Sequence, residues 1–163
     1  MASTVSMLID VLPATLSASN NKTVIDKWMV AGVSLGAHAA WMAMDRGSPD
    51  FLDITTVRNT TTYVPLLSSL MTPATRDYII KNDPISRHSN PGKSNPFMNK
   101  HVLAVAGAQD AMMPLLPTRQ FINRIDVGPL GSKRLIIQEG VGHQCTREML
   151  IHLAEFVWTL ELE

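Results

Sequence analysis

Three residues of the chain, Ser34, Asp110 and His143, have the side chains and the order needed for nucleophilic catalysis. A serine hydroxyl becomes a useful nucleophile when a histidine takes its proton. A carboxylate makes that histidine a better base by holding one tautomer and stabilising the imidazolium. Because the three lie far apart in the chain, this chemistry depends on a fold that brings them together.

Ser34 lies in Gly32-Val33-Ser34-Leu35-Gly36, which matches the pattern G-x-S-x-G. An apolar run at residues 28–33 precedes it and predicts a buried strand. The Ala- and Met-rich residues 35–45 that follow predict a helix. In this context the pattern indicates a sharp, strained strand-to-helix turn, and we expect a side chain at either flanking glycine to crowd it. The alternative is an ordinary turn serine in a chance match.

Asp110 and His143 each follow a predicted strand. Residues 102–106 are apolar and lead into Gly107-Ala108-Gln109-Asp110, and residues 135–138 lead into Gly140-Val141-Gly142-His143. Catalytic groups of parallel sheets gather beyond the carboxyl ends of the strands. The alternatives are that Asp110 caps the following turn and that His143 is a surface histidine.

The three motifs together resemble those of the α/β-hydrolase superfamily, in its esterase and peptidase-like branch, and the resemblance covers almost the whole chain. It implies that Ser34 is the nucleophile, His143 the general base and then acid, and Asp110 the orienting carboxylate. The backbone N–H of Leu35 would donate to the oxyanion. The expected reaction is hydrolysis of a carboxylic ester, or of an amide or thioester, through an acyl-enzyme, with no metal or organic cofactor.

The sequence departs from the family pattern in the part of the chain before the serine turn. Family members place four strands there, and the loop after the third supplies a second oxyanion donor; only about one helix precedes residue 28 here. Loss of one such donor costs roughly 10²–10³ in rate, so slow turnover is expected unless another group or chain replaces it. The alternatives are a catalytically impaired remnant that acts as a binding or assembly module, and acyl transfer by the same three residues.

The hydrophobic pattern predicts the elements that would hold these residues. Strands alternating with helices indicate an α/β fold, here a partial α/β-hydrolase fold of about four mainly parallel strands flanked by helices, in one domain over residues 1–163. The remaining expected elements are a first helix at 5–16 that Pro13 kinks or splits, a strand at 53–59, helical pieces at 64–71 and 75–81, and helices at 118–125 and 147–160.

Apolar residues near the three motifs are candidates for a substrate pocket. Residues 60–98 form a possible cap over the site, although its apolar residues could equally be ordinary core. The candidate pocket residues, drawn from the cap, the serine turn and the loop after Asp110, are Val33, Leu67, Leu70, Met112 and Met113.

Composition limits the partners. Lys plus Arg equal Asp plus Glu at 14 each, so nothing favours nucleic acid or an anionic membrane. The expected partner is a small ester, with a possible homodimer through the open edge of the strand 28–33. Cys145 is the only cysteine, which fits the cytosol; we expect it to be partly buried.

The histidines outside the three motifs are not expected to act in catalysis or to bind metal. His38 lies one turn after Ser34 and is expected to pack on its helix. His88, His101 and His152 lack the spacing of a metal site.

Overall fold

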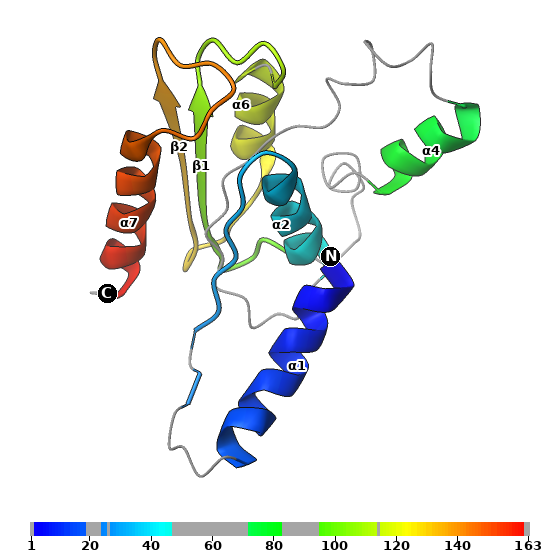
Figure 1. The fold of residues 1–163 in the computed structure, drawn as a ribbon, viewed down its shortest axis with the longest axis vertical. Helices are drawn as coiled ribbons and strands as arrows, with labels where there is room; N and C mark the ends of the chain where they lie inside the picture. Colours follow the sequence, from blue (N-terminus) through cyan, green and yellow to red (C-terminus); the bar gives the residue numbers. More distant parts are fainter. Residues whose placement is uncertain are drawn as a thin grey trace.

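The computed structural model describes residues 2–18, 24–25, 27–46, 72–82, 95–113 and 115–161. Helices and strands alternate along the second half of the chain (Figure 1), which confirms the α/β class. The elements are α1 (Ala2–Ala18), α2 (Leu35–Arg46), α4 (Pro73–Asn82), β1 (His101–Gly107), α6 (Leu115–Arg124), β2 (Ser132–Gln138) and α7 (Arg147–Glu161).

Strands β1 and β2 pair in parallel, from His101 opposite Ser132 to Gly107 opposite Gln138. Parallel strands need a crossover connection, and α6 provides it. The two strands therefore end at the same edge of the sheet. The loop that carries Asp110 and the loop that carries His143 both begin at that edge.

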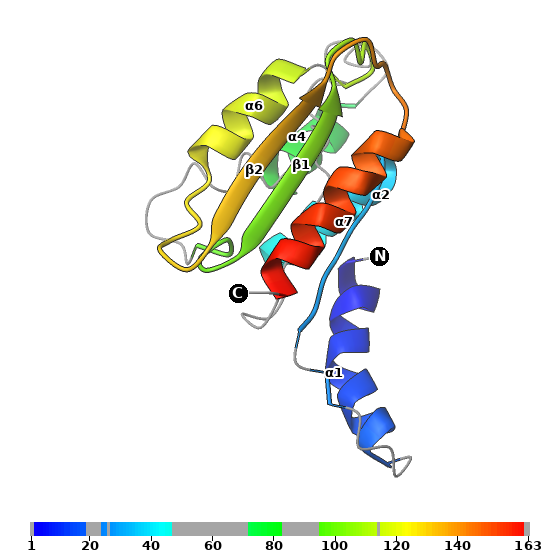
Figure 2. The same ribbon diagram turned by 90° about the vertical axis from the view of Figure 1, so that its left-hand side faces the viewer.

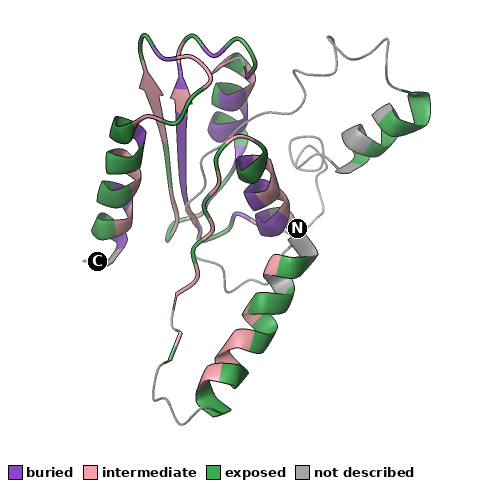
Figure 3. Ribbon diagram, viewed as in Figure 1, coloured by how far each residue is buried: buried purple, intermediate pink, exposed green. Residues whose placement is uncertain are grey.

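Alternate residues of β1 face two different layers, because successive side chains of a strand point to opposite sides. Val102 and Ala104 pack in a cluster with residues of α2 and α6, including Trp41 and Phe121. Leu103 lies in a second cluster with residues of α7. Figure 2 shows α7 on one side of the sheet and α6 on the other, and Figure 3 shows buried residues concentrated along β1 and the inner sides of α2 and α6. The strand is thus buried on both faces.

Several predicted boundaries differ from those observed. The helix predicted at 118–125 is α6 and begins at Leu115, and the strand predicted at 135–138 is β2 and begins at Ser132. Polar residues at the start of β2 join the ladder because they pair with β1. Of the two effects expected of Pro13, a split of the first helix is wrong, because α1 runs through Pro13, and a kink stays a prediction. A proline removes one helical hydrogen bond, and the helix continues on both sides of it.

The strand predicted at 28–33 is also wrong. Residues 27–32 form no ladder, and β1 and β2 are the only paired strands within the ranges given above. The apolar run instead contributes side-chain packing, with Val30 against the cluster that contains Trp41. The segments 53–59 and 64–71 lie outside the described residues, so the strand predicted at 53–59 stays a prediction and the predicted total of about four strands is not confirmed.

The possible cap at 60–98 is described only in part. Helix α4 confirms the helical piece predicted at 75–81 and lies apart from the sheet (Figure 1). Phe97, near the end of the segment, is fully buried in the cluster with Trp41, so this end of the segment belongs to the core. None of the helices described here combines the length and the apolar character that crossing a bilayer requires.

Candidate active site

Ser34 lies on a tight turn that leads into α2. Its φ is 57°, in the left-handed region that a serine rarely occupies. The backbone N–H of Gly36 donates to the carbonyl of Val33 at 2.9 Å and closes the turn. Such strain persists only where the surroundings enforce it, and it is common at functional sites.

The two glycines that flank the turn differ in the space around them. A Cβ on Gly32 would lie 2.2 Å from the backbone carbon of Gly36, so only glycine fits there. A Cβ on Gly36 would meet no atom within 4 Å. The expectation that a side chain at Gly36 would crowd the turn is therefore wrong, because the close approach is made by the Gly36 backbone against Gly32.

The Ser34 side chain reaches His143, which lies 109 residues further along the chain. Ser34 Oγ and His143 Nε2 are 3.1 Å apart, within the 2.6–3.2 Å or so expected of a nucleophile and its base. The hydroxyl can donate to Nε2 when the imidazole carries its proton on Nδ1. A quarter of the His143 side chain is exposed, so the ring remains accessible from solvent.

Asp110 lies on the other side of the same imidazole. Its Oδ1 and Oδ2 are 3.2 and 3.1 Å from His143 Nδ1, an arrangement that favours the Nδ1–H tautomer. Only 3% of the Asp110 side chain is exposed. Its Oδ1 also accepts hydrogen bonds from the backbone N–H groups of Met112 and Met113, at 3.0 and 2.9 Å. Asp110 thus caps its own turn and contacts the histidine with the same carboxylate.

Backbone contacts hold the Asp110 loop against the His143 loop. The N–H of Gln109 donates to the carbonyl of Val141 at 2.9 Å, and the N–H of Ala108 donates to that of Gln138 at 2.9 Å. The loops approach so closely that a Cβ on Gly107 would lie 2.3 Å from the Val141 oxygen. The sequence motif around Asp110 includes Gly107 but does not reveal this close contact with Val141.

The backbone N–H of Leu35 belongs to the first residue of α2 and has no hydrogen-bond partner among the residues that the structure describes. The N–H groups at helix starts attract negative charge because of the aligned peptide dipoles. This donor is therefore available beside Ser34.

An apolar hollow lies beside the serine turn, between residues 31–33, β1 and the first half of α7. Val33 is among its described lining residues, whereas the exposed Met112 and the buried Met113 are not, and the assignment of all three to a substrate pocket stays a prediction. The backbone N–H groups of Met112 and Met113 contact the Asp110 carboxylate, a pattern that an aspartate before a turn could have signalled. Leu67 and Leu70 lie outside the described residues.

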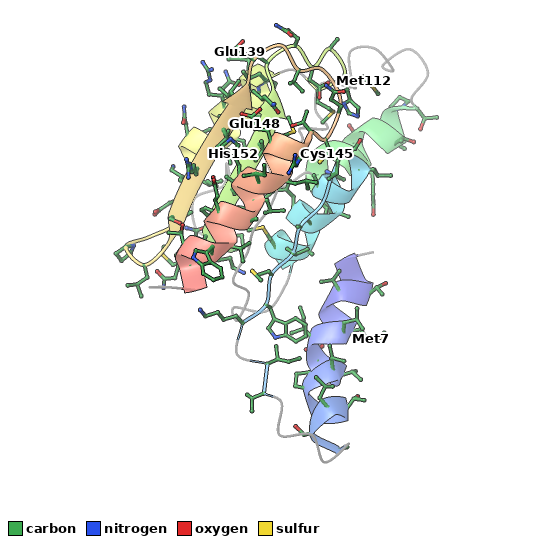
Figure 4. The ribbon with its side chains drawn as sticks, turned by 60° about the vertical axis from the view of Figure 1, so that its left-hand side comes forward. Met7, Met112, Glu139, Cys145, Glu148 and His152 are labelled. Atoms are coloured by element: carbon green, nitrogen blue, oxygen red, sulfur yellow. The ribbon has the colours of Figure 1, made fainter. Side chains whose placement is uncertain are left out.

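The structure also places the other residues that the sequence raised as candidates. Cys145 is exposed, contrary to expectation, because it lies in the loop between His143 and α7 (Figure 4). His38 is half-buried on α2. His101 Nδ1 lies 2.8 Å from Ser132 Oγ, and His152 contacts Glu155; His88 is outside the described ranges. Among the residues with described positions, no group of three or more potential metal ligands occurs.

A scan against protein-family models found no match, and a search of curated proteins found none either. Solved structures do match. SOBER1 of Arabidopsis thaliana is 14% identical with a TM-score of 0.58, and the match covers 97% of this chain and 61% of that one. Esterase PE8 is 17% identical with a TM-score of 0.52, covering 97% and 61%. A puromycin-hydrolyzing peptidase of Mycobacterium tuberculosis is 14% identical with a TM-score of 0.63, covering 91% and 24%.

At these identities the likeness is one of fold, and the chain spans less than two thirds of the length of these three proteins. Their common architecture is that of the α/β-hydrolases. The chain therefore has a partial α/β-hydrolase fold.

Proposed function

We propose that this chain is a serine hydrolase that cleaves a carboxylic ester through an acyl-enzyme, with Ser34, His143 and Asp110 as its catalytic residues. The observation that carries the proposal is the hydrogen-bonded series from Ser34 Oγ through the His143 ring to the Asp110 carboxylate. The strained turn at Ser34 supports it, since a left-handed serine has no packing advantage of its own. Two of the fold neighbours are an esterase and a puromycin-hydrolyzing peptidase, which supports the proposal.

The proposed reaction runs in two halves. Ser34 Oγ attacks the ester carbonyl while its proton passes to His143 Nε2. The tetrahedral intermediate then collapses, the carbon–oxygen bond to the alcohol breaks, and the alcohol leaves with the proton from Nε2. Water next attacks the acyl-enzyme and gives a proton to Nε2, and collapse returns that proton to Ser34 Oγ and releases the acid. Asp110 stabilises the imidazolium in both halves.

The Leu35 N–H is the proposed first oxyanion donor. Without a second donor, the rate falls roughly 10²–10³-fold below that of a complete site. The same acyl-enzyme would transfer its acyl group to an alcohol or amine where water is excluded.

Hydrolysis of p-nitrophenyl acetate by the purified chain tests the proposal. Ser34→Ala is expected to remove the activity above background. Ser132→Ala is the matched control, because Ser132 also contacts a histidine, His101, at the start of the sheet. Equal activity in wild type and Ser34→Ala would overturn the proposal, as would a loss confined to Ser132→Ala.

A second candidate is a catalytically impaired relative that acts as a binding or assembly module. The low identity to the neighbours, 14–17%, favours it, because a likeness at this level is one of fold and not of activity. This second candidate would be supported if the folded wild-type protein neither hydrolyses esters nor reacts with a fluorophosphonate at Ser34. For either function we propose a homodimer and a reducing compartment, the latter because the single thiol of Cys145 is exposed.

A further inference from the structure

We propose that the hollow beside Ser34 binds the acyl chain of the substrate, so that the preferred substrates are esters of unbranched apolar acids several carbons long. This inference rests on the proposed function and names its substrate class. It goes beyond the catalytic residues because it assigns a role to α7 and to the loop after His143.

The lining of the hollow is mostly apolar and comes from four parts of the chain, the serine turn, β1, the loop after His143 and α7. The serine turn contributes Val33, β1 contributes Val105, and α7 contributes Met149, Leu150 and Leu153. Among the described residues that line it, none is charged and Gln144 alone has an amide side chain. Apolar walls without charge favour a neutral hydrocarbon group over a charged or strongly polar one.

The position of the hollow links it to the reacting atoms. Gly32 and Val33, which line it, directly precede Ser34, and Gln144 and Cys145, which also line it, directly follow His143. The hollow is therefore bordered by the residues next to the proposed nucleophile and next to its proposed base, and an acyl group on Ser34 would extend from the edge of the hollow.

The hollow opens to solvent. The space in it that water-sized groups can occupy is about 50 Å³, room for a few chain carbons, and its empty volume of about 440 Å³ includes open solvent. Leu150, half exposed, and the exposed Cys145 both line it. Figure 4 shows Cys145 where the His143 loop meets α7. A chain that fills the hollow would cover both side chains.

The first test uses the wild-type protein. Ser34 is labelled with an ethyl or an octyl phosphonofluoridate, in which the serine oxygen displaces fluoride from phosphorus and the hydroxyl proton is lost to solvent. The rate of Cys145 alkylation by N-ethylmaleimide is then measured; Cys145 is the only thiol in the chain. The octyl label is expected to slow alkylation at least fivefold relative to the ethyl label. Equal rates with both labels would overturn the inference.

The second test uses two neighbouring residues of α7 with similar exposure. Leu150 lines the hollow and is 52% exposed, whereas Ile151 does not line it and is 45% exposed. Leu150→Trp fills the opening and is expected to reduce octyl relative to ethyl labelling by about tenfold, since each buried methylene is worth about fourfold. Ile151→Trp is expected to leave the ratio unchanged.

The outcomes separate the two proposals. If neither label reacts at Ser34, the proposed function fails and this inference fails with it. If both labels react at Ser34 but chain length affects neither Cys145 nor the Leu150→Trp ratio, the hydrolase proposal stands and the inference about the hollow is wrong.

Discussion

The carboxylate of Asp110 accepts two backbone hydrogen bonds from its own turn and also contacts His143. An oxygen that caps a turn is held in place by that turn, so the imidazole meets an acceptor of fixed position. Asp110 can therefore be a turn cap and an orienting acid at the same time, because one carboxylate makes both sets of contacts.

Asp110→Asn separates these two roles. The amide oxygen can still accept from Met112 and Met113, but the amide nitrogen cannot accept from His143 Nδ1–H. The expected result is a folded protein whose kcat falls by about 10⁴-fold, the size of this effect in the serine protease triad. Measured esterase rates check it, with Asp126→Asn as control, because Asp126 caps only the N–H of Gly128. An unchanged rate in Asp110→Asn would contradict the proposed role.

The two glycines of the serine turn provide a second prediction at this scale. Gly32→Ala places a Cβ against the Gly36 backbone and is expected to lower the free energy of unfolding by about 1–3 kcal/mol. Gly36→Ala meets open space and is expected to change it by less than about 1 kcal/mol. Thermal unfolding distinguishes the two variants, at about 2–4 °C of Tm for each kcal/mol. Equal losses would contradict the close approach.

At the scale of elements, β1 connects the two layers, because its alternate side chains pack on α7 and on the cluster of α2 and α6. Leu103 is fully buried on the α7 side. Leu103→Ala is expected to cost about 2–5 kcal/mol of stability. Leu116→Ala on α6 is expected to cost under about 0.5 kcal/mol, since Leu116 is 64% exposed. Denaturant unfolding of both variants checks the difference.

The sequence predicted the elements best where one periodicity was strong. The period of 3.6 in residues 147–160 and the apolar run at 102–106 correspond to α7 and β1 within one residue at each end. The equally apolar run at 28–33 does not form a strand, because strand formation also needs a hydrogen-bonding neighbour that composition does not reveal.

The three proposed catalytic residues were predictable because each lies in a short local motif next to an apolar run. Ser34, Asp110 and His143 could be selected from local motifs at predicted strand ends, and the structure brings the three side chains together. The contact of Gly107 with Val141 and the exposure of Cys145 depend on how two distant loops meet. No local pattern contains that information.

At the scale of the whole molecule, apolar side chains remain uncovered along the segment before Ser34 and on α1. Met29 is 48% exposed, and Met7 on α1, which lies away from the sheet in Figure 4, is 56% exposed. Exposed apolar groups of this kind favour self-association when they form a continuous patch. These residues are the basis for predicting a homodimer, although the segment 28–33 is not the edge strand first expected to form it.

Met29→Lys tests the predicted dimer, because a charge at the contact would have to be desolvated on association. Light scattering at increasing concentration is expected to give a dimer for wild type and at least a tenfold weaker one for Met29→Lys. Leu130→Lys, at a turn residue that is 72% exposed, is the control and is expected to dimerise like wild type. A wild-type monomer at high concentration would contradict the prediction.

The most direct test of the hydrolase account locates the site of covalent labelling. Wild-type protein is treated with a fluorophosphonate and digested, and the modified peptide is sequenced by mass spectrometry. The account predicts one adduct, on Ser34, that is lost in Ser34→Ala and strongly slowed in His143→Ala. Labelling at another residue, or labelling of Ser34 that proceeds equally fast without the imidazole, would contradict it.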